Sequence, residues 1–188
     1  MLKIGTHDSI TGEKSYWLSL PLVPFACTQS KTIKEQYYAG CRVFDIRAKY
    51  AFGKWRGAHG WWFTSKGLEE ILCQINGWAD ISPICVHLTY EGKAKNSAEF
   101  KKQAEIWIEK YSNIIWGPIC TKYSDNSLKV KYTVLIPSQQ GAFGGSQAFL
   151  PLDGKHWQTY IPIPWLWKQF YFKNVEFNEE YYQFVDFL

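Results

Sequence analysis

The chain has 188 residues, of which 46% are hydrophobic and 20% charged, and its formal net charge is +4. This length and balance predict a single folded domain over residues 1–188 and exclude a disordered chain. Lys and Arg are scattered along the sequence, which argues against nucleic-acid binding. The five cysteines form no CxxC motif, so we expect neither a zinc site nor a disulfide framework.

No signal peptide and no apolar run of the ~18 residues that a membrane span needs is visible. We therefore expect a cytoplasmic protein, or a secreted one if a leader was removed, and a monomer. Aromatic residues make up 18% of the chain. Most of them should pack in the core, although amphipathic rings at the surface would suit a membrane interface.

Short apolar runs alternate with amphipathic stretches along the first half of the chain. We predict strands over 2–7, 41–50, 55–63, 82–91, 130–137 and 181–188, and helices over 30–40, 67–79 and 97–115. Ser30 is a candidate N-cap and Gly40 a stop for the first helix. Residues 139–149 form a Gly-rich loop, and 157–172 are aromatic and interrupted by proline.

The alternation of strand and helix predicts parallel pairing with right-handed crossovers, and hence an α/β fold. The helical pattern fades in the second half. A regular (β/α)₈ barrel usually needs ~250 residues. A barrel of this length would therefore be small and irregular, with helices reduced in its second half.

Polar residues stand at or just beyond the ends of predicted strands, where parallel α/β folds place their active sites. They are His7 with Asp8, Asp45 with Arg47, His59, and Asp186.

Asp45 and Arg47 are two residues apart, so their side chains share one face of a strand, while Phe44 and Ile46 occupy the other. The pair could be a structural ion pair, because burying two charges is costly unless both are used. It could equally be an arginine held by an aspartate and directed at a phosphate, which suits a planar guanidinium.

His7 and His59 follow different strands, and glycines flank both segments. Two histidines can serve as base and acid on opposite sides of a phosphodiester. Asp8 or Asp186 could orient one imidazole and stabilise its charged form.

Three segments together resemble the bacterial phosphatidylinositol-specific phospholipase C catalytic X domain: "GTHDS" (5–9), "TQSKTIKEQYYAGCRVFDIR" (28–47) and "AHG" (58–60). The order and spacing of these segments match that family. The clear similarity covers residues 4–91, and "FVDFL" (184–188) is similar to the family's last barrel strand. The resemblance implies a TIM-like barrel and a phosphoric diester hydrolase or lyase that forms a cyclic phosphodiester.

The same resemblance implies roles for the polar residues. His7 matches the general base, His59 the general acid, and Arg47 the phosphate-stabilising arginine, with Asp45 beside it. Asp8 is expected to assist the acid, and Asp186 is the best match to the aspartate that orients the base. Since "FDIR" offers one carboxylate and one cation, we expect no metal and no cofactor.

The headgroup contacts of the family are missing, because Thr89 and Tyr90 occupy the region of an inositol-contacting lysine. We therefore expect a phospholipid or another phosphodiester as substrate. His87 and Thr89 are candidates to line its pocket, although His87 could equally be a buried structural residue. Trp61 and Trp62 follow "HG" directly and could contact a lipid interface or cover the pocket, or simply pack.

Two other functions stay open at this point. A non-catalytic barrel that binds phospholipid or phosphate would agree with the missing headgroup contacts, but it would not need two proton-transfer groups. A metal-dependent phosphodiesterase on a related barrel would use Asp8 and Asp45 as metal ligands.

Overall fold

The computed structural model describes residues 4–6, 8–121 and 183–185. Its strands are β1 (Ile4–Thr6), β2 (Cys41–Ala51), β3 (Lys54–His59), β4 (Trp62–Phe63), β5 (Cys85–Tyr90), β6 (Ile115–Thr121) and β7 (Gln183–Val185). Its α-helices are α1 (Val23–Ala26), α2 (Ile33–Tyr38), α3 (Leu68–Ala79) and α4 (Ser97–Lys110). Three short 3-10 helices complete the described parts: η1 (Ser9–Gly12), η2 (Trp17–Leu22) and η3 (Ala94–Asn96).

The core of the molecule is a parallel sheet with strand order β7-β1-β2-β5-β6. The hairpin β3-β4 extends it, because β3 pairs antiparallel with the last four residues of β2. The fold is thus α/β with a mixed sheet. The described strands form an open sheet, in which β6 and β7 have one strand neighbour each.

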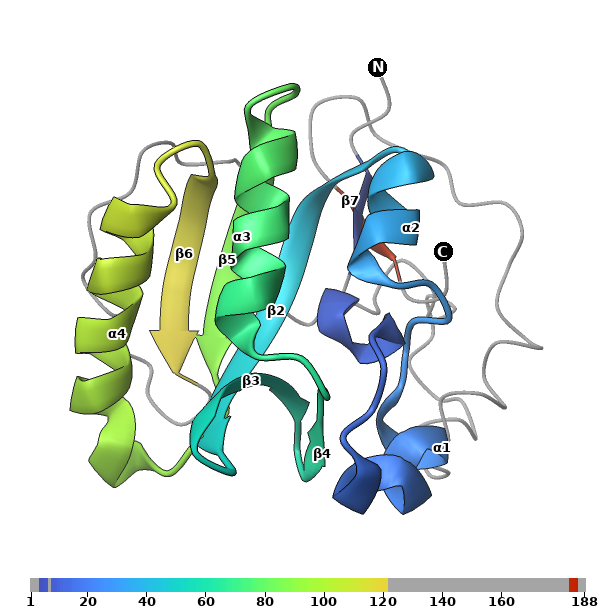
Figure 1. Cartoon of the computed structure of the whole chain (residues 1–188), viewed down its shortest axis with the longest axis vertical. Coiled ribbons are helices and arrows are strands. Elements are labelled where there is room, and N and C mark those ends of the chain that lie inside the picture. Colours follow the sequence, from blue (N-terminus) through green and yellow to red (C-terminus); the bar gives the residue numbers. More distant parts are fainter. Residues whose placement is uncertain (1–3, 7, 122–182, 186–188) are drawn as a thin grey trace, which may run out of the picture.

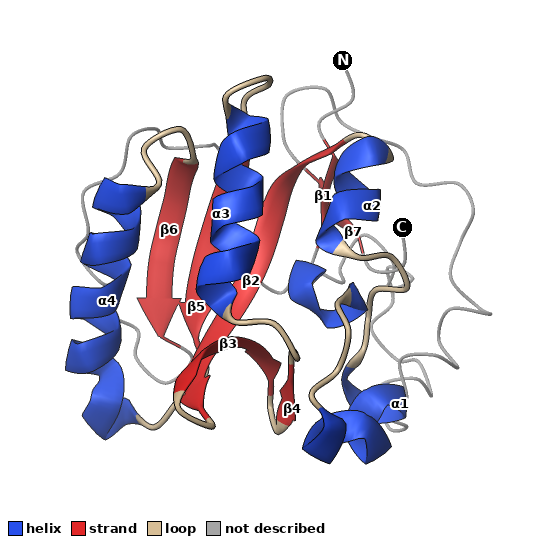
Figure 2. Ribbon diagram, in the orientation of Figure 1, coloured by secondary structure: helices blue, strands red, loops and turns tan. Residues whose placement is uncertain are grey.

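The two faces of the sheet differ in chemistry because side chains alternate along each strand. Phe44, Ile46, Val86 and Leu88 lie on the face that α3 and α4 cover, where they join the hydrophobic core (Figure 2). The other face carries Asp45, Arg47, His87, Thr89 and Glu91, and the register places Asp45 beside His87 and Arg47 beside Thr89. Polar groups therefore gather on the face away from these two helices.

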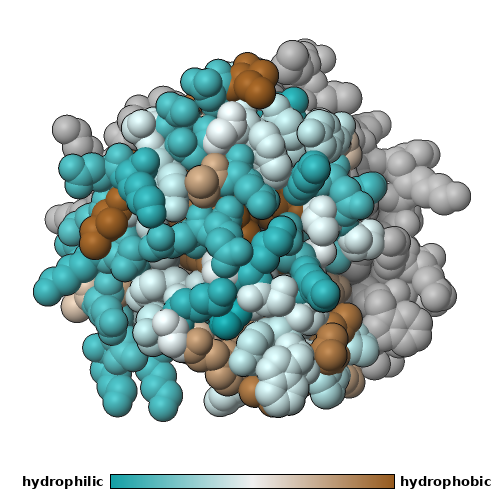
Figure 3. All heavy atoms as spheres, in the orientation of Figure 1, coloured by the Kyte–Doolittle hydropathy of each residue, from teal (hydrophilic) through white to brown (hydrophobic). Residues whose placement is uncertain are grey.

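The parallel strands all run in one direction, and the helices between them return in the other (Figure 1). The carboxyl ends of the strands consequently meet at the lower edge of the view, together with the β3-β4 hairpin and α1. Figure 3 shows that the outer surface of α3 and α4 is largely hydrophilic, which agrees with one apolar face turned to the sheet. No helix in the described ranges is long and apolar enough to cross a membrane.

The first helix begins two residues later than expected. Thr32, not Ser30, is its N-cap, and Thr32 and Glu35 each accept a hydrogen bond from the other's backbone N–H. Gly40 ends the helix as predicted, because its φ of 102° is a conformation that residues with a Cβ rarely adopt.

Two predicted elements are wrong in extent. The single strand expected over 55–63 is a hairpin, since Gly60, with φ of 62°, turns the chain between β3 and β4. The helix expected over 97–115 ends at Lys110, and its last predicted residue instead begins β6. The elements predicted over 130–137, 139–149 and 157–172 lie outside the described residues.

Candidate functional site

The candidate site contains Asp8, which follows β1, and Asp45 and Arg47, which lie on β2. Asp8 is the second residue after the end of β1, and it adopts a left-handed conformation with φ of 46° and ψ of 41°. Such a backbone is uncommon for a residue with a Cβ, although Asp and Asn adopt it more readily than most. The Asp8 N–H donates to Asp45 Oδ2 at 3.2 Å, so the turn after β1 is fastened to β2.

Two further hydrogen bonds, both to Ser9, hold the same turn against β2 and α2. The Ser9 hydroxyl accepts from the Asp45 N–H at 2.8 Å, and Gln36 of α2 donates to the Ser9 carbonyl at 2.7 Å. All three residues are buried. The positions of Asp8 and Asp45 are therefore fixed by backbone hydrogen bonds rather than by their charges alone.

Arg47 is the centre of the charged cluster, and three carboxylates surround it. Its Nε pairs with Asp8 Oδ1 and lies 3.8 Å from Asp45 Oδ2, while Nη1 donates to Glu91 Oε1 at 2.9 Å. Burial alone would lower the pKa of Arg47, but the three carboxylates outweigh it and raise this pKa above its ordinary value. The guanidinium is therefore charged near neutral pH.

His59, the last residue of β3, completes the cluster from the hairpin side. Its Nδ1 lies 2.6 Å from the Ala26 carbonyl, and its Nε2 lies 3.6 Å from Asp8 Oδ2. A carbonyl oxygen can only accept, so Nδ1 carries a hydrogen. Nε2 is consequently the nitrogen that gains and loses a proton, and it is the nitrogen that faces Asp8.

Glu91 is a site residue that the sequence reasoning did not select. It directly follows β5, and its side chain is 1% exposed. Oε1 binds Arg47, while Oε2 accepts from the Gly60 N–H at 2.6 Å. Glu91 therefore joins the arginine to the turn that follows His59. Its position two residues beyond Thr89, on the same strand face, was the signal that could have identified it.

Solvent reaches the members of this cluster unequally. The side chains of Arg47 and His59 are 17% and 26% exposed, whereas those of Asp8, Asp45 and Glu91 are 2%, 5% and 1% exposed. The carboxylates are thus almost fully buried, and the guanidinium and the imidazole are the groups of the cluster that solvent reaches most. An anion that approaches the site meets these two groups first.

The predicted lining residues have different environments. His87 is 1% exposed and packs against Gly117, where a Cβ would lie 2.5 Å from its Cδ2. Burial lowers the pKa of His87, and the negative charge of Asp45 opposes this in part. Thr89 is partly buried beside Arg47 in the register. His87 is thus a buried neighbour of the cluster rather than an accessible group.

Trp61 and Trp62 are adjacent at the hairpin turn, but one is exposed and the other is buried. Trp61 is 77% exposed, and Lys49 Nζ lies 4.8 Å above its ring. Trp62 is fully buried, and its indole N–H donates to Ser15 Oγ at 2.8 Å. Only Trp61 of the two could contact a lipid interface.

The structure brings together Asp8, Asp45, Arg47 and His59 from the predicted set. His7 and Asp186 lie outside the described residues, so their places in the site stay predictions. In the described part of the chain, no group of three or more His, Cys, Asp or Glu side chains is arranged to hold a metal ion. The three carboxylates converge on Arg47 instead.

No family model and no curated protein sequence matches this chain. Among solved structures, it is similar to the phosphatidylinositol-specific phospholipase C from Listeria monocytogenes, with 25% identity and a TM-score of 0.48. The match covers 60% of this chain and 40% of that chain. A likeness of this extent does not by itself assign an activity, which depends on the chemistry of the site.

Proposed function

We propose that this protein cleaves a phosphodiester, in a phospholipid or a related molecule, by acid–base catalysis without a metal ion. The observation that carries this proposal is that the Asp8 carboxylate pairs with Arg47 and also faces Nε2 of His59. One buried carboxylate thereby sets the position of a phosphate-binding cation relative to a proton-transfer group. Both groups are partly exposed to solvent, by 17% for Arg47 and 26% for His59.

His59 is proposed as the general acid. The Ala26 carbonyl holds its Nδ1–H, so the imidazolium can give up the proton on Nε2 to the oxygen that leaves phosphorus. Asp8 stabilises the imidazolium from 3.6 Å before the transfer. When the phosphorus–oxygen bond breaks, that proton neutralises the leaving alkoxide.

Arg47 is proposed to stabilise the charge that develops on the phosphoryl oxygens. A guanidinium has five N–H donors, so contacts with the three carboxylates do not use all of them. Since Asp8, Asp45 and Glu91 hold it in place, the positive charge does not need to reorganise during the reaction. Asp45 acts here by positioning Asp8 and Arg47.

The attacking group is proposed to be a hydroxyl of the substrate itself, with His7 as the base and Asp186 as its orienting partner. The resemblance of "GTHDS" (5–9) and "FVDFL" (184–188) to the phospholipase family supports these two roles. Attack from within the substrate would give a cyclic phosphodiester as the first product. We further propose that the sheet closes as a small TIM-like barrel with the cluster on its inner side.

Exposed apolar side chains support a lipid substrate. They come from η2, α1, the β2-β3 turn and the β3-β4 turn, and we call them the apolar rim: Trp17, Leu18, Leu20, Phe25, Phe52 and Trp61, each 49–77% exposed. The hairpin and α1 lie at the carboxyl end of the parallel strands (Figure 1). Ala26, the last residue of α1, also provides the carbonyl that orients His59. A membrane bound at this apolar rim would face the site.

The activity test is cleavage of phosphatidylinositol vesicles, and of a chromogenic inositol phosphodiester, in the presence of EDTA. We expect a cyclic phosphodiester product in both cases and no effect of the chelator. Loss of activity with EDTA would favour the metal-dependent alternative. Binding to vesicles without any product would favour the non-catalytic barrel. Replacing Trp61 with alanine should lower activity on vesicles while leaving activity on the soluble diester unchanged.

A further inference from the structure

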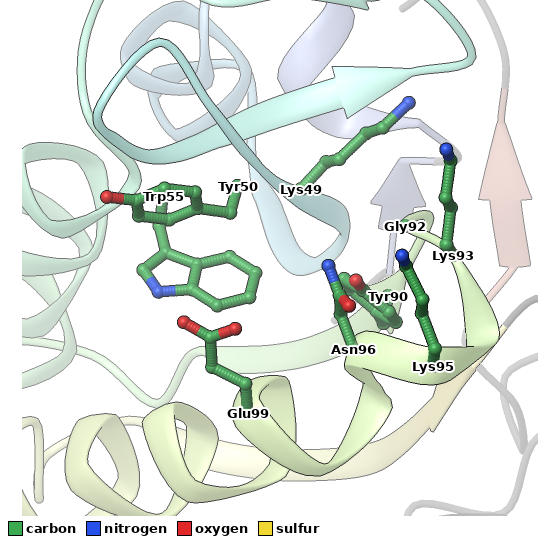
Figure 4. Close-up of a pocket in the computed structure, with 9 residues that line it drawn as sticks. All are labelled: Lys49, Tyr50, Trp55, Tyr90, Gly92, Lys93, Lys95, Asn96 and Glu99. Carbon is green, nitrogen blue, oxygen red and sulfur yellow. The ribbon is translucent and has the colours of Figure 1, made fainter.

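A pocket lies beside the ends of β2 and β5 and is lined by residues other than those of the charged cluster. It encloses about 340 Å³ between the β2-β3 hairpin, the end of β5 and the start of α4. Its lining is shown in Figure 4: Lys49, Tyr50, Trp55, Tyr90, Gly92, Lys93, Lys95, Asn96 and Glu99. None of these residues belongs to the proposed catalytic set.

Three lysines and one glutamate give this pocket a net positive charge. In Figure 4 the ammonium groups of the lysines lie toward one side, whereas the Glu99 carboxylate lies by the Trp55 ring. Lys93 and Lys95 have no carboxylate within ion-pair distance in the described part of the chain. An anion bound in the pocket would be attracted by the positive charge of these ammonium groups.

The pocket also contains a phenolic hydroxyl. Tyr90, which carries it, is 2% exposed as a whole residue, and its ring stacks on Phe100 at 4.8 Å. Gly92 leaves room for this hydroxyl, since a Cβ there would lie 2.0 Å from it. Burial raises the pKa of Tyr90, so the hydroxyl remains a hydrogen-bond donor near neutral pH.

We propose that this pocket binds a phosphomonoester, distinct from the phosphodiester that the charged cluster would cleave. A phosphomonoester carries a charge of roughly −1.5 to −2 and three acceptor oxygens, which matches three ammonium groups and one hydroxyl. The Trp55 and Tyr90 rings provide an apolar wall for the rest of the ligand. The phosphate could belong to a soluble metabolite or to an anionic lipid headgroup, and the test below separates these sources.

The pocket is connected to the catalytic cluster through Lys49. Its Nζ donates to the Gly60 carbonyl at 3.3 Å, and the Gly60 N–H donates to Glu91, which holds Arg47. A bound phosphate that draws Lys49 toward itself would act on the turn after His59.

The binding experiment uses the full chain and two probes. Glycerol 3-phosphate represents the soluble source, and phosphatidylcholine vesicles with or without phosphatidic acid represent the lipid source. Calorimetry and sedimentation measure binding, while the acetylation rate of each lysine, followed by mass spectrometry, locates it. We expect at least one phosphate probe to bind and to slow acetylation of Lys93 and Lys95.

The double variant Lys93→Ala/Lys95→Ala should weaken this binding by roughly ten-fold or more, since hydrogen bonds to charged groups are lost. Lys34→Ala/Lys102→Ala, which removes the same charge from exposed helix positions, should bind like the unmodified protein. Soluble binding assigns a metabolite, and binding only to phosphatidic acid vesicles assigns a lipid headgroup. The proposal is wrong if neither probe binds, or if the pocket variant binds as tightly as the control. Neither result depends on whether the protein cleaves a phosphodiester.

Discussion

Glu91→Gln tests the energetic role of the buried carboxylate that joins Arg47 to Gly60. Both partners of Glu91 are donors: Arg47 Nη1 at 2.9 Å and the Gly60 N–H at 2.6 Å. Glutamine has one carbonyl oxygen and one NH₂ group, so one of the two donors would face another donor. An unsatisfied buried donor costs ~1–3 kcal/mol, and the loss of one charge beside Arg47 adds to this. Arg47 retains Asp8 and Asp45, so we expect a total loss of about 2–4 kcal/mol in the free energy of unfolding.

Glu70 offers a matched control at the surface. It accepts from the Gly67 N–H at 2.8 Å and lies 3.4 Å from Lys54 Nζ, but its side chain is 58% exposed. Glu70→Gln should therefore cost less than ~1 kcal/mol. Urea unfolding followed by circular dichroism measures both variants. Equal losses would refute the reasoning, and so would a gain in stability for Glu91→Gln, because that would show that repulsion among the three carboxylates dominates.

Three further predictions concern stability and reactivity. Burial lowers the pKa of His87, so stability should be complete above its unfolded pKa of about 6.5 and fall as the pH drops below it; His87→Gln should flatten this part of the pH profile. Native protein should react with a maleimide at exposed Cys73 and not at Cys41, whose pKa burial raises to about 12, while urea should make both reactive. Gly77→Ala in α3 has open space for its Cβ and should stabilise the protein by ~0.5–1 kcal/mol. Gly57→Ala, whose Cβ would lie 2.2 Å from Ile10 Cδ1, should destabilise it. Thermal unfolding measures both variants, and the opposite order of stability would contradict the packing around these two glycines.

The sequence predicted β1, β2, β5, α2 and α3 because their patterns are local, but it predicted neither α1 (Val23–Ala26) nor the 3-10 helices before it. The stripe of Leu68, Ile71, Leu72 and Ile75 marks one side of α3, and all four are buried. The errors arose where a single backbone conformation changes the element. Gly60 turns the single strand predicted over 55–63 into a hairpin, and Tyr111 ends α4 in a non-helical conformation before the chain enters β6.

The candidate site was predictable from spacing only in part. Alternation along a strand places Asp45 and Arg47 on one face, and the structure shows both beside Asp8. The contacts that orient His59 were not predictable, because one comes from a main-chain carbonyl and any residue at position 26 would supply it. The alternation along β5 could have placed Glu91 on the face of Thr89, but its contact with Arg47 depends on the register between β2 and β5, which a single sequence does not give.

The leaving-group dependence of the His59→Ala variant tests the central claim most directly. An alkoxide such as that of diacylglycerol needs a proton as it leaves, whereas nitrophenolate does not. We predict that His59→Ala lowers kcat/KM on phosphatidylinositol by ~10²–10⁴-fold. On a chromogenic inositol phosphodiester whose leaving group is nitrophenolate, the same variant should lower kcat/KM far less. Equal losses on the two substrates, or an unchanged rate on phosphatidylinositol, would contradict a general-acid role for His59.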